Sequence, residues 1–290
     1  MKNNSNKSLD RAESILDSRL ILTTNKKVYD IKVVVCGDYL QLYFYDNKKL
    51  LKKNDDNIDL KLKKNNIENS LMETIENKPK KSKLKAANKI EEKNIIRSKL
   101  ECQRLAKSNI KEWETFITLT FADNITDLEY ANKKFRYFID KVKRVKKDFK
   151  YLCITEFQKR GATHYHLLCN VNVNDKTLIY AQKDNPKFKH IKYWNDGFTS
   201  VEIIKGDAKK IIGYIAKYMT KDIDNRLFNR HRYFYSRNLT TPKENFINLD
   251  YEIDNAFYQK IIQDKKLIYQ NEYVNPYDNN KVAFLEFIKK

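Results

Sequence analysis

The sequence predicts an α+β fold, in which an antiparallel sheet carries helices on one face. Between residues 115 and 222, strand-like apolar runs alternate with amphipathic segments in the order strand, helix, strand, strand, strand, helix. A short turn over residues 158–162 separates the second and third strands, so these two form an antiparallel hairpin. This order predicts helices and sheet packed as two layers.

The N-terminal part of the chain has weaker signals. Residues 31–35 and 39–45 flank Gly37-Asp38 and predict a β-hairpin. Residues 46–94 are dominated by Lys, Asn, Asp and Glu, which is typical of a charged linker or a weak helix. The pattern over 95–112 then predicts a helix leading into the main domain. The predicted organisation is a basic N-terminal region over 1–95, a main domain over 96–240 and a C-terminal extension over 241–290.

The main domain opens with a strand and a helix. Thr115 to Phe121 is β-branched and aromatic, as expected of a central strand. Thr126 and Glu129 have the spacing of a capping box, which predicts the start of a helix. That helix has one apolar face, and residues 133–150 hold nine Lys/Arg against two Asp. Its basic face is either solvated or in contact with a DNA backbone.

The second half of the domain supplies the hairpin and the last helix. Residues 151–157 and 163–171 are its two strands, and 172–197 is expected to be an irregular insertion. A fourth strand covers 198–204, and Asp207 is expected to cap a helix that ends near residue 222. Together these elements predict a sandwich of the ferredoxin-like, or RRM-like, kind.

Composition narrows the function. A net charge of +20 and a pI near 9.5 favour a polyanionic partner, with nucleic acid ahead of a membrane surface. No run approaches 18 apolar residues and the N-terminus lacks a signal-peptide core, so we expect a cytoplasmic protein with no membrane partner. The four cysteines lack CxxC spacing, which argues against a zinc ribbon, and the missing P-loop motif excludes a fused ATP-driven helicase.

Two histidines and a glutamate form the first candidate site. His164 and His166 alternate along one strand and therefore share a face. Glu156 can oppose His164 across the hairpin, so the three side chains can converge on one divalent metal ion. A lone His-x-His pair is more often a structural feature, but the glutamate and the later tyrosines favour a metal site.

Two tyrosines form the second candidate site. Tyr214 and Tyr218 lie one helical turn apart, on a stripe shared with Lys217 and Lys221. Such a pair usually only covers an amphipathic helix. Beside a metal-bound phosphate, however, a tyrosyl oxygen can act as a nucleophile supported by the lysines. The combination suggests an enzyme that cuts DNA and stays attached to it.

Three segments resemble the motifs of the HUH endonucleases, specifically the rolling-circle replication initiators of small plasmids and single-stranded DNA phages. The segments are Phe116 to Phe121, Glu156 to His166, and Tyr214 to Tyr218; a later segment, Tyr233 to Leu239, is also typical of such initiators. The resemblance covers about residues 96–240.

The resemblance implies a site-specific endonuclease and strand transferase. It makes His164 and His166 metal ligands, Glu156 the third ligand, and Tyr214 or Tyr218 the nucleophile, with Tyr214 favoured if one acts alone. It implies Mg²⁺ or Mn²⁺, single-stranded origin DNA, and a host helicase and polymerase as partners. The residues expected to contact DNA are Lys143, Arg144, Lys146, Lys159 and Arg160.

Two alternatives remain. One is a single-strand transposase with the same chemistry, and the other is a non-catalytic nucleic-acid-binding module on the same fold. A conjugative relaxase fits poorly, because it commonly has a three-histidine cluster and an N-terminal tyrosine.

Overall fold

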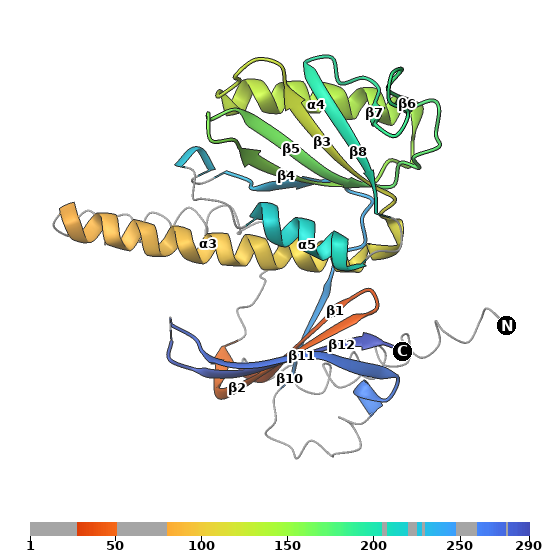
Figure 1. Cartoon of the computed structure of the whole chain (residues 1–290). Helices are drawn as coiled ribbons and strands as arrows, with labels where there is room; N and C mark the ends of the chain where they lie inside the picture. The colour runs from red at the N-terminus through yellow and green to blue at the C-terminus, as the bar shows by residue number, and fades with distance from the viewer. Residues whose placement is uncertain are drawn as a thin grey trace. The chain divides into compact units, whose positions relative to one another are not determined.

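The computed structural model describes residues 28–50, 80–204, 208–219, 225–227, 230–247, 260–276 and 278–290 (Figure 1). The chain divides into two compact units, each considered by itself. Unit 1 comprises residues 1–88 and 242–290, and unit 2 comprises residues 89–241. No helix in these ranges has both the length and the apolar character needed to cross a membrane.

Unit 1 contains an antiparallel five-stranded sheet in the order β10-β1-β2-β12-β11. Its strands are β1 (Val28–Cys36), β2 (Tyr39–Leu50), β10 (Lys243–Ile247), β11 (Lys265–Val274) and β12 (Lys281–Lys289). The predicted hairpin is confirmed, and Gly37 supplies its turn with a φ of 60°. The sequence analysis treats the two ends of the chain as separate regions, but β10 and β12 flank the hairpin and join them in one sheet.

Unit 2 contains a second five-stranded antiparallel sheet, in the order β8-β3-β5-β4-β9. Its strands are β3 (Thr115–Phe121), β4 (Tyr151–Phe157), β5 (Thr163–Cys169), β8 (Gly197–Ile203) and β9 (Tyr233–Tyr235). The predicted strands and the α+β class are therefore confirmed. The central strand is β5, and all seven of its residues are buried.

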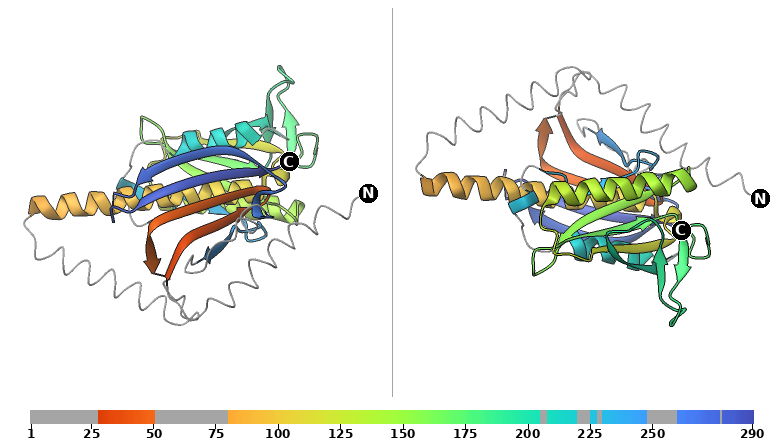
Figure 2. Two further views of the ribbon diagram at one scale, coloured as in Figure 1. Left: turned by 90° about the horizontal axis from the view of Figure 1, so that it is seen from below. Right: turned by 90° about the horizontal axis from the view of Figure 1, so that it is seen from above.

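Helices cover both faces of the unit 2 sheet, so the expectation of helices on one face is wrong. Helix α4 (Leu128–Val145) packs on the face that bears Ile117 and Tyr165, and it lies in front of the sheet when the chain is seen from above (Figure 2). Helices α3 (Lys80–Ser108) and α5 (Ala208–Met219) supply side chains to the core on the other face, which bears Phe116 and Leu168 (Figure 1). Because β5 is apolar in both alternating positions, both faces need a covering layer.

Two local predictions also change. Asp127, not Thr126, caps α4, and its carboxylate accepts hydrogen bonds from the backbone N–H groups of Glu129 and Tyr130. The expected irregular insertion contains a small hairpin of β6 (Ile179–Ala181) and β7 (Lys189–Ile191). Two short 3-10 helices, Ile110–Glu112 and Asn225–Leu227, complete the unit. The proposed cap Asp207 lies outside the described residues.

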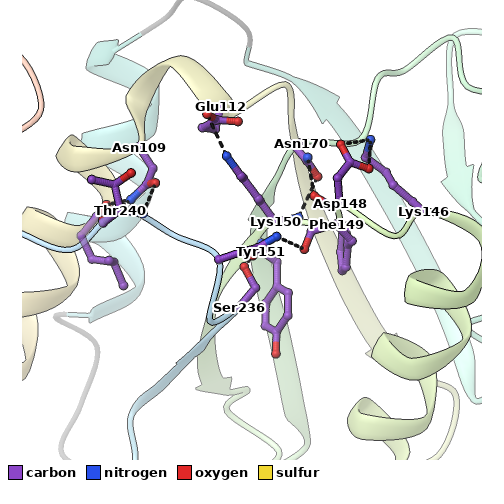
Figure 3. A network of polar contacts seen from close by, with 12 residues as sticks. Asn109, Glu112, Lys146, Asp148, Phe149, Lys150, Tyr151, Asn170, Ser236 and Thr240 are labelled. Atoms are coloured by element: carbon purple, nitrogen blue, oxygen red, sulfur yellow. Dashed lines mark hydrogen bonds and ion pairs between the residues drawn. The ribbon is translucent and has the colours of Figure 1, made fainter.

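Polar contacts hold one end of the unit 2 sheet together (Figure 3). The buried amide of Asn109 donates to the carbonyls of Leu105 and Thr240, and its oxygen accepts from the Thr240 N–H at 2.9 Å. Ser236 exchanges hydrogen bonds with the backbone of Tyr151. These contacts tie the chain that follows β9 to the C-terminal end of α3 and to β4, at the end of the sheet away from the histidines.

Candidate active site

Strand register brings the predicted acidic and imidazole groups together. Glu156 on β4 pairs directly with His164 on β5, as expected, and Thr120 on β3 pairs with His164 from the other side. His166 lies two residues further along β5, so its side chain is on the same face. The site is therefore built on the sheet's central strand, where the backbone is held by ladders on both sides.

His166 is the centre of the contacts. Its Nε2 lies 2.5 Å from Oε2 of Glu156, and its Nδ1 lies 3.1 Å from the hydroxyl of Thr118. The ring of His164 is 6.2 Å from that of His166. Both imidazoles and the Glu156 carboxylate are buried, with between 5% and 7% of each residue exposed. Thr118 thus orients the imidazole ring while Glu156 occupies the nitrogen that faces the site.

Helix α5 places both tyrosines against this group. The Tyr218 ring stacks on His166 with 3.8 Å between centroids, and Tyr214 stacks on Phe116 at 4.1 Å. The two tyrosine rings are 6.4 Å apart, and Nζ of Lys217 lies 5.0 Å from the Tyr218 ring. Tyr218 is therefore the tyrosine beside the histidines, whereas Tyr214 lies one ring further away. Lys221 lies outside the described residues.

The donor set fits a divalent metal in its chemistry. Two imidazoles and a carboxylate are common ligands of such ions, and burial would limit competition from water. Within the described ranges, however, no group of three or more His, Cys, Asp or Glu side chains is already arranged around one point. The direct contact between His166 and Glu156 explains this, because these two groups would have to separate to hold an ion between them.

The basic residues expected to contact DNA fall into two separate groups. Lys159 and Arg160 lie in the turn between β4 and β5, a few residues beyond Glu156, and Lys159 is exposed. Lys143 and Arg144 lie in the last turn of α4, which packs on the opposite face of the sheet. Lys146 caps the same helix end and pairs with Asp148 at 3.1 Å. Only the turn group lies at the histidine end.

Two residues of the site were not singled out from the sequence. Phe116 and Thr118 alternate along β3, and both face the α5 side of the sheet. Phe116 supports the Tyr214 ring, and Thr118 supports His166. Strand alternation could have identified both, because Thr118 pairs with His166 in the register of β3 and β5.

The later segment that resembles replication initiators has a structural role here. Tyr233 packs against the α5-side core, and burial raises the pKa of its phenol above the usual value, helped by the nearby Glu101. Ser236 is buried and holds β9 to β4. None of these contacts involves the histidines.

Comparison with known proteins points to DNA replication. Residues 114–223 match a family of replication-associated proteins, described under the name ORF2. The chain is also similar to the Phasyl DNA replicon protein arp of Escherichia coli, with 29% identity over 127 residues, which is 38% of this chain and 44% of that protein. The chain thus spans less than half the length of that relative. No solved structure gives a significant match. The matched stretch contains Glu156, both site histidines and both tyrosines.

Proposed function

We propose that this chain initiates rolling-circle replication by nicking single-stranded origin DNA with a tyrosine and later rejoining the strand. One observation carries the proposal. The Tyr218 ring lies directly on His166, whose Nε2 contacts the Glu156 carboxylate, on the central strand of the sheet. The similarity of residues 114–223 to replication-associated proteins supports the same conclusion.

The chemistry needs only a phosphodiester exchange. The phenolic oxygen of Tyr218 attacks the scissile phosphorus, a Tyr–O–P bond forms and the P–O3′ bond breaks. The phenolic proton is lost to the surroundings and the released 3′-oxygen takes up a proton, so the step is balanced. The product is a 5′-phosphotyrosine and a free 3′-hydroxyl. Because the exchange is nearly neutral in energy, a later 3′-hydroxyl can reverse it and rejoin a strand.

The side chains of His164, His166 and Glu156 would hold the metal, which we propose to be Mg²⁺ or Mn²⁺. When bound, the ion supplies charge stabilisation at the non-bridging oxygens of the phosphate. Thr118 keeps the His166 ring in place through Nδ1, which leaves Nε2 directed into the site. The ammonium of Lys217 lies near the Tyr218 ring and favours ionisation of the attacking phenol.

The second tyrosine has a defined place in this scheme. Tyr214 lies one turn before Tyr218 and is held by Phe116, with its ring parallel to that of Tyr218. A second cleavage while Tyr218 is loaded would therefore require Tyr214 to reach the same phosphate position. We also propose a host helicase and polymerase as partners, because the nick must be extended and the strand displaced.

The test is formation of a covalent protein–DNA adduct. Single-stranded oligonucleotides that tile the replicon encoding this chain are incubated with protein and Mg²⁺ or Mn²⁺, and adducts are resolved on a denaturing gel. We expect Tyr218→Phe to lose the first cleavage and Tyr214→Phe to retain it. The matched control is Tyr137→Phe, which removes an exposed hydroxyl from α4. Mass spectrometry of the adduct identifies the modified residue.

The same assay separates the alternatives. His166→Ala should abolish the adduct while DNA binding persists, because lysines and arginines supply the affinity. DNA binding without any adduct from the wild type, with either metal, would support a non-catalytic binding module instead. An adduct that survives in the double Tyr214→Phe, Tyr218→Phe variant would remove both tyrosines from the chemistry.

A further inference from the structure

One cross-strand row links the site to the edge of the sheet. Phe198 on β8 pairs with Thr120 on β3, Thr120 pairs with His164 on β5, and His164 pairs with Glu156 on β4. Residues paired in this way share a face of the sheet. With about 4.8 Å between neighbouring strands, the Phe198 backbone lies about 10 Å from that of His164. Phe198 is therefore the next large side chain along the row from the histidine.

The Phe198 ring is exposed where a packing role would bury it. The residue is 70% exposed, whereas Phe116, on the same face at the other end of β3, is 5% exposed beneath Tyr214. A single exposed apolar residue needs no explanation by itself. Phe198, however, also lines a pocket of about 450 Å³, which is within the range of small-ligand sites.

The pocket combines a fixed floor, aromatic walls and polar groups. A Cβ on Gly197 would lie 2.2 Å from the Thr120 carbonyl oxygen, so only glycine allows this close approach of β8 to β3. Tyr130, which is 44% exposed, lines the pocket together with Phe198, and Asp123 and Asn195 supply polar groups. Aromatic surfaces beside a few hydrogen-bonding groups are suited to a flat heteroaromatic ligand.

We propose that this pocket takes one unpaired nucleobase of the single strand, next to the scissile phosphate, and that the base stacks on Phe198. The inference rests on the proposed function, because the histidine row defines where the phosphate lies. Single-stranded DNA is the occupant that the chain's charge of +20 favours, and its bases are unpaired and free to enter. Phe198 would thereby position the strand and set the register of the cut.

The first test detects stacking directly. Oligonucleotides carry the fluorescent base 2-aminopurine at one position at a time on either side of the nick, and stacking quenches its emission. Wild-type protein should quench strongly at one position or two adjacent ones. Phe198→Ala and Phe198→Leu should lose that quenching, since leucine keeps apolar area without a π face, whereas Phe198→Trp should keep it. Tyr137→Ala removes an exposed aromatic ring of α4 and is the matched control.

The second test is a cycle between the protein and the strand. An abasic site at the quenched position should weaken binding of the wild type about 5- to 100-fold, the range expected for one lost base stack. Phe198→Ala should weaken binding of the intact strand by a similar factor and should then be insensitive to the abasic site. Equal thermal unfolding of the variants and the wild type confirms that the exposed side chain is not needed for folding.

The outcomes separate the two proposals. Unchanged quenching and affinity in Phe198→Ala, with adduct formation intact, would overturn the base pocket and leave the nicking function standing. Phe198-dependent quenching at one position without any adduct would support the pocket while the nicking function fails. Equal loss of affinity in Phe198→Ala and Tyr137→Ala would also overturn it, because a general effect on binding would then replace a specific one.

Discussion

At the scale of single residues, His166 has a different neighbour on each side. Glu156 contacts Nε2, Thr118 contacts Nδ1, and Tyr218 lies on the ring face. These contacts fix the ring's rotation as well as its position. Any chemistry at Nε2 therefore depends on a hydroxyl that never touches the substrate.

Thr118→Val tests this dependence. The change keeps the shape of the side chain and removes the hydroxyl that lies 3.1 Å from Nδ1. Loss of such a supporting contact typically costs 10- to 100-fold in metal affinity or activity, so we expect the metal concentration for half-maximal nicking to rise by about that factor. Titration of Mg²⁺ or Mn²⁺ in the nicking assay measures it.

The matched control is Thr155→Val, on the neighbouring strand β4. Thr155 is buried and pairs with Tyr165, which faces α4, and its hydroxyl makes no hydrogen bond within the described structure. It should titrate like the wild type. If both variants shift the metal dependence equally, Thr118 has no specific role in orienting His166.

At the scale of elements, the first turn of α4 is held by one carboxylate. Asp127 accepts the N–H of Glu129 at 2.8 Å and that of Tyr130 at 3.2 Å. Thr126 instead offers only its carbonyl, which accepts from Arg226. The backbone reaches its first helical residue at Leu128, so the cap is one residue later than the Thr-x-x-Glu spacing indicates.

Two alanine variants separate these caps. Asp127→Ala should lower the free energy of unfolding by about 1 kcal/mol, within the usual 0.5–2 kcal/mol for a lost N-cap. Thr126→Ala should cost much less, because the Thr126 carbonyl is retained. Urea denaturation of both variants measures the difference. A larger loss in Thr126→Ala would restore the capping box.

At the scale of the whole molecule, the basic charge is unevenly useful to a strand in the active site. Lys159 and Arg160 follow Glu156 in the turn at the histidine end, whereas Lys143, Arg144 and Lys146 belong to the far end of α4 on the other face. A strand that reaches the histidines would pass the turn first.

Salt dependence distinguishes the two basic groups. Each phosphate neutralised on a single strand contributes about 0.7 to the slope of log K against log salt. Reversing both Lys159 and Arg160 to Glu should reduce the slope by at least about 1.4, which binding titrations from low to moderate salt would measure. Reversing Lys143, Arg144 and Lys146 should change it little; a larger change there would place the strand on α4 instead.

Alkaline pH should destabilise the fold through buried acids that stay protonated in it. Burial raises the pKa of Tyr151 to about 12 and that of the Cys169 thiol to about 11, and it also raises the pKa of Tyr165 and Cys153. In the unfolded chain these groups ionise near pH 10 and 8.5. Because the folded state then holds more protons, stability is unaffected below about pH 8.5 and falls above it.

The decline should be steepest above pH 10. Each such group contributes up to about 1.4 kcal/mol per pH unit between its unfolded and folded pKa. Urea denaturation at pH 8, 10 and 11 measures the slope. The double variant Tyr151→Phe, Tyr165→Phe should show a shallower decline above pH 10 than the wild type, and Tyr137→Phe should not. An equal decline in all three would assign the effect to other groups.

The local features of the site follow from the sequence alone. Strand alternation placed Glu156, His164 and His166 on one face, and the short turn of residues 158–162 set the register that pairs Glu156 with His164. Helical spacing placed Tyr214 and Tyr218 on one stripe. These patterns depend on periods of two and 3.6 residues, which a single sequence carries in full.

The remaining features depend on which surfaces pack together, and the folded chain was needed to see them. The covering of both sheet faces, the stacking of Tyr218 rather than Tyr214 on His166, and the union of the two chain ends in one sheet are contacts between residues far apart in sequence. The same holds for the separation of the α4 lysines from the site. No periodicity encodes such contacts, since each results from burying one element's apolar face against another's.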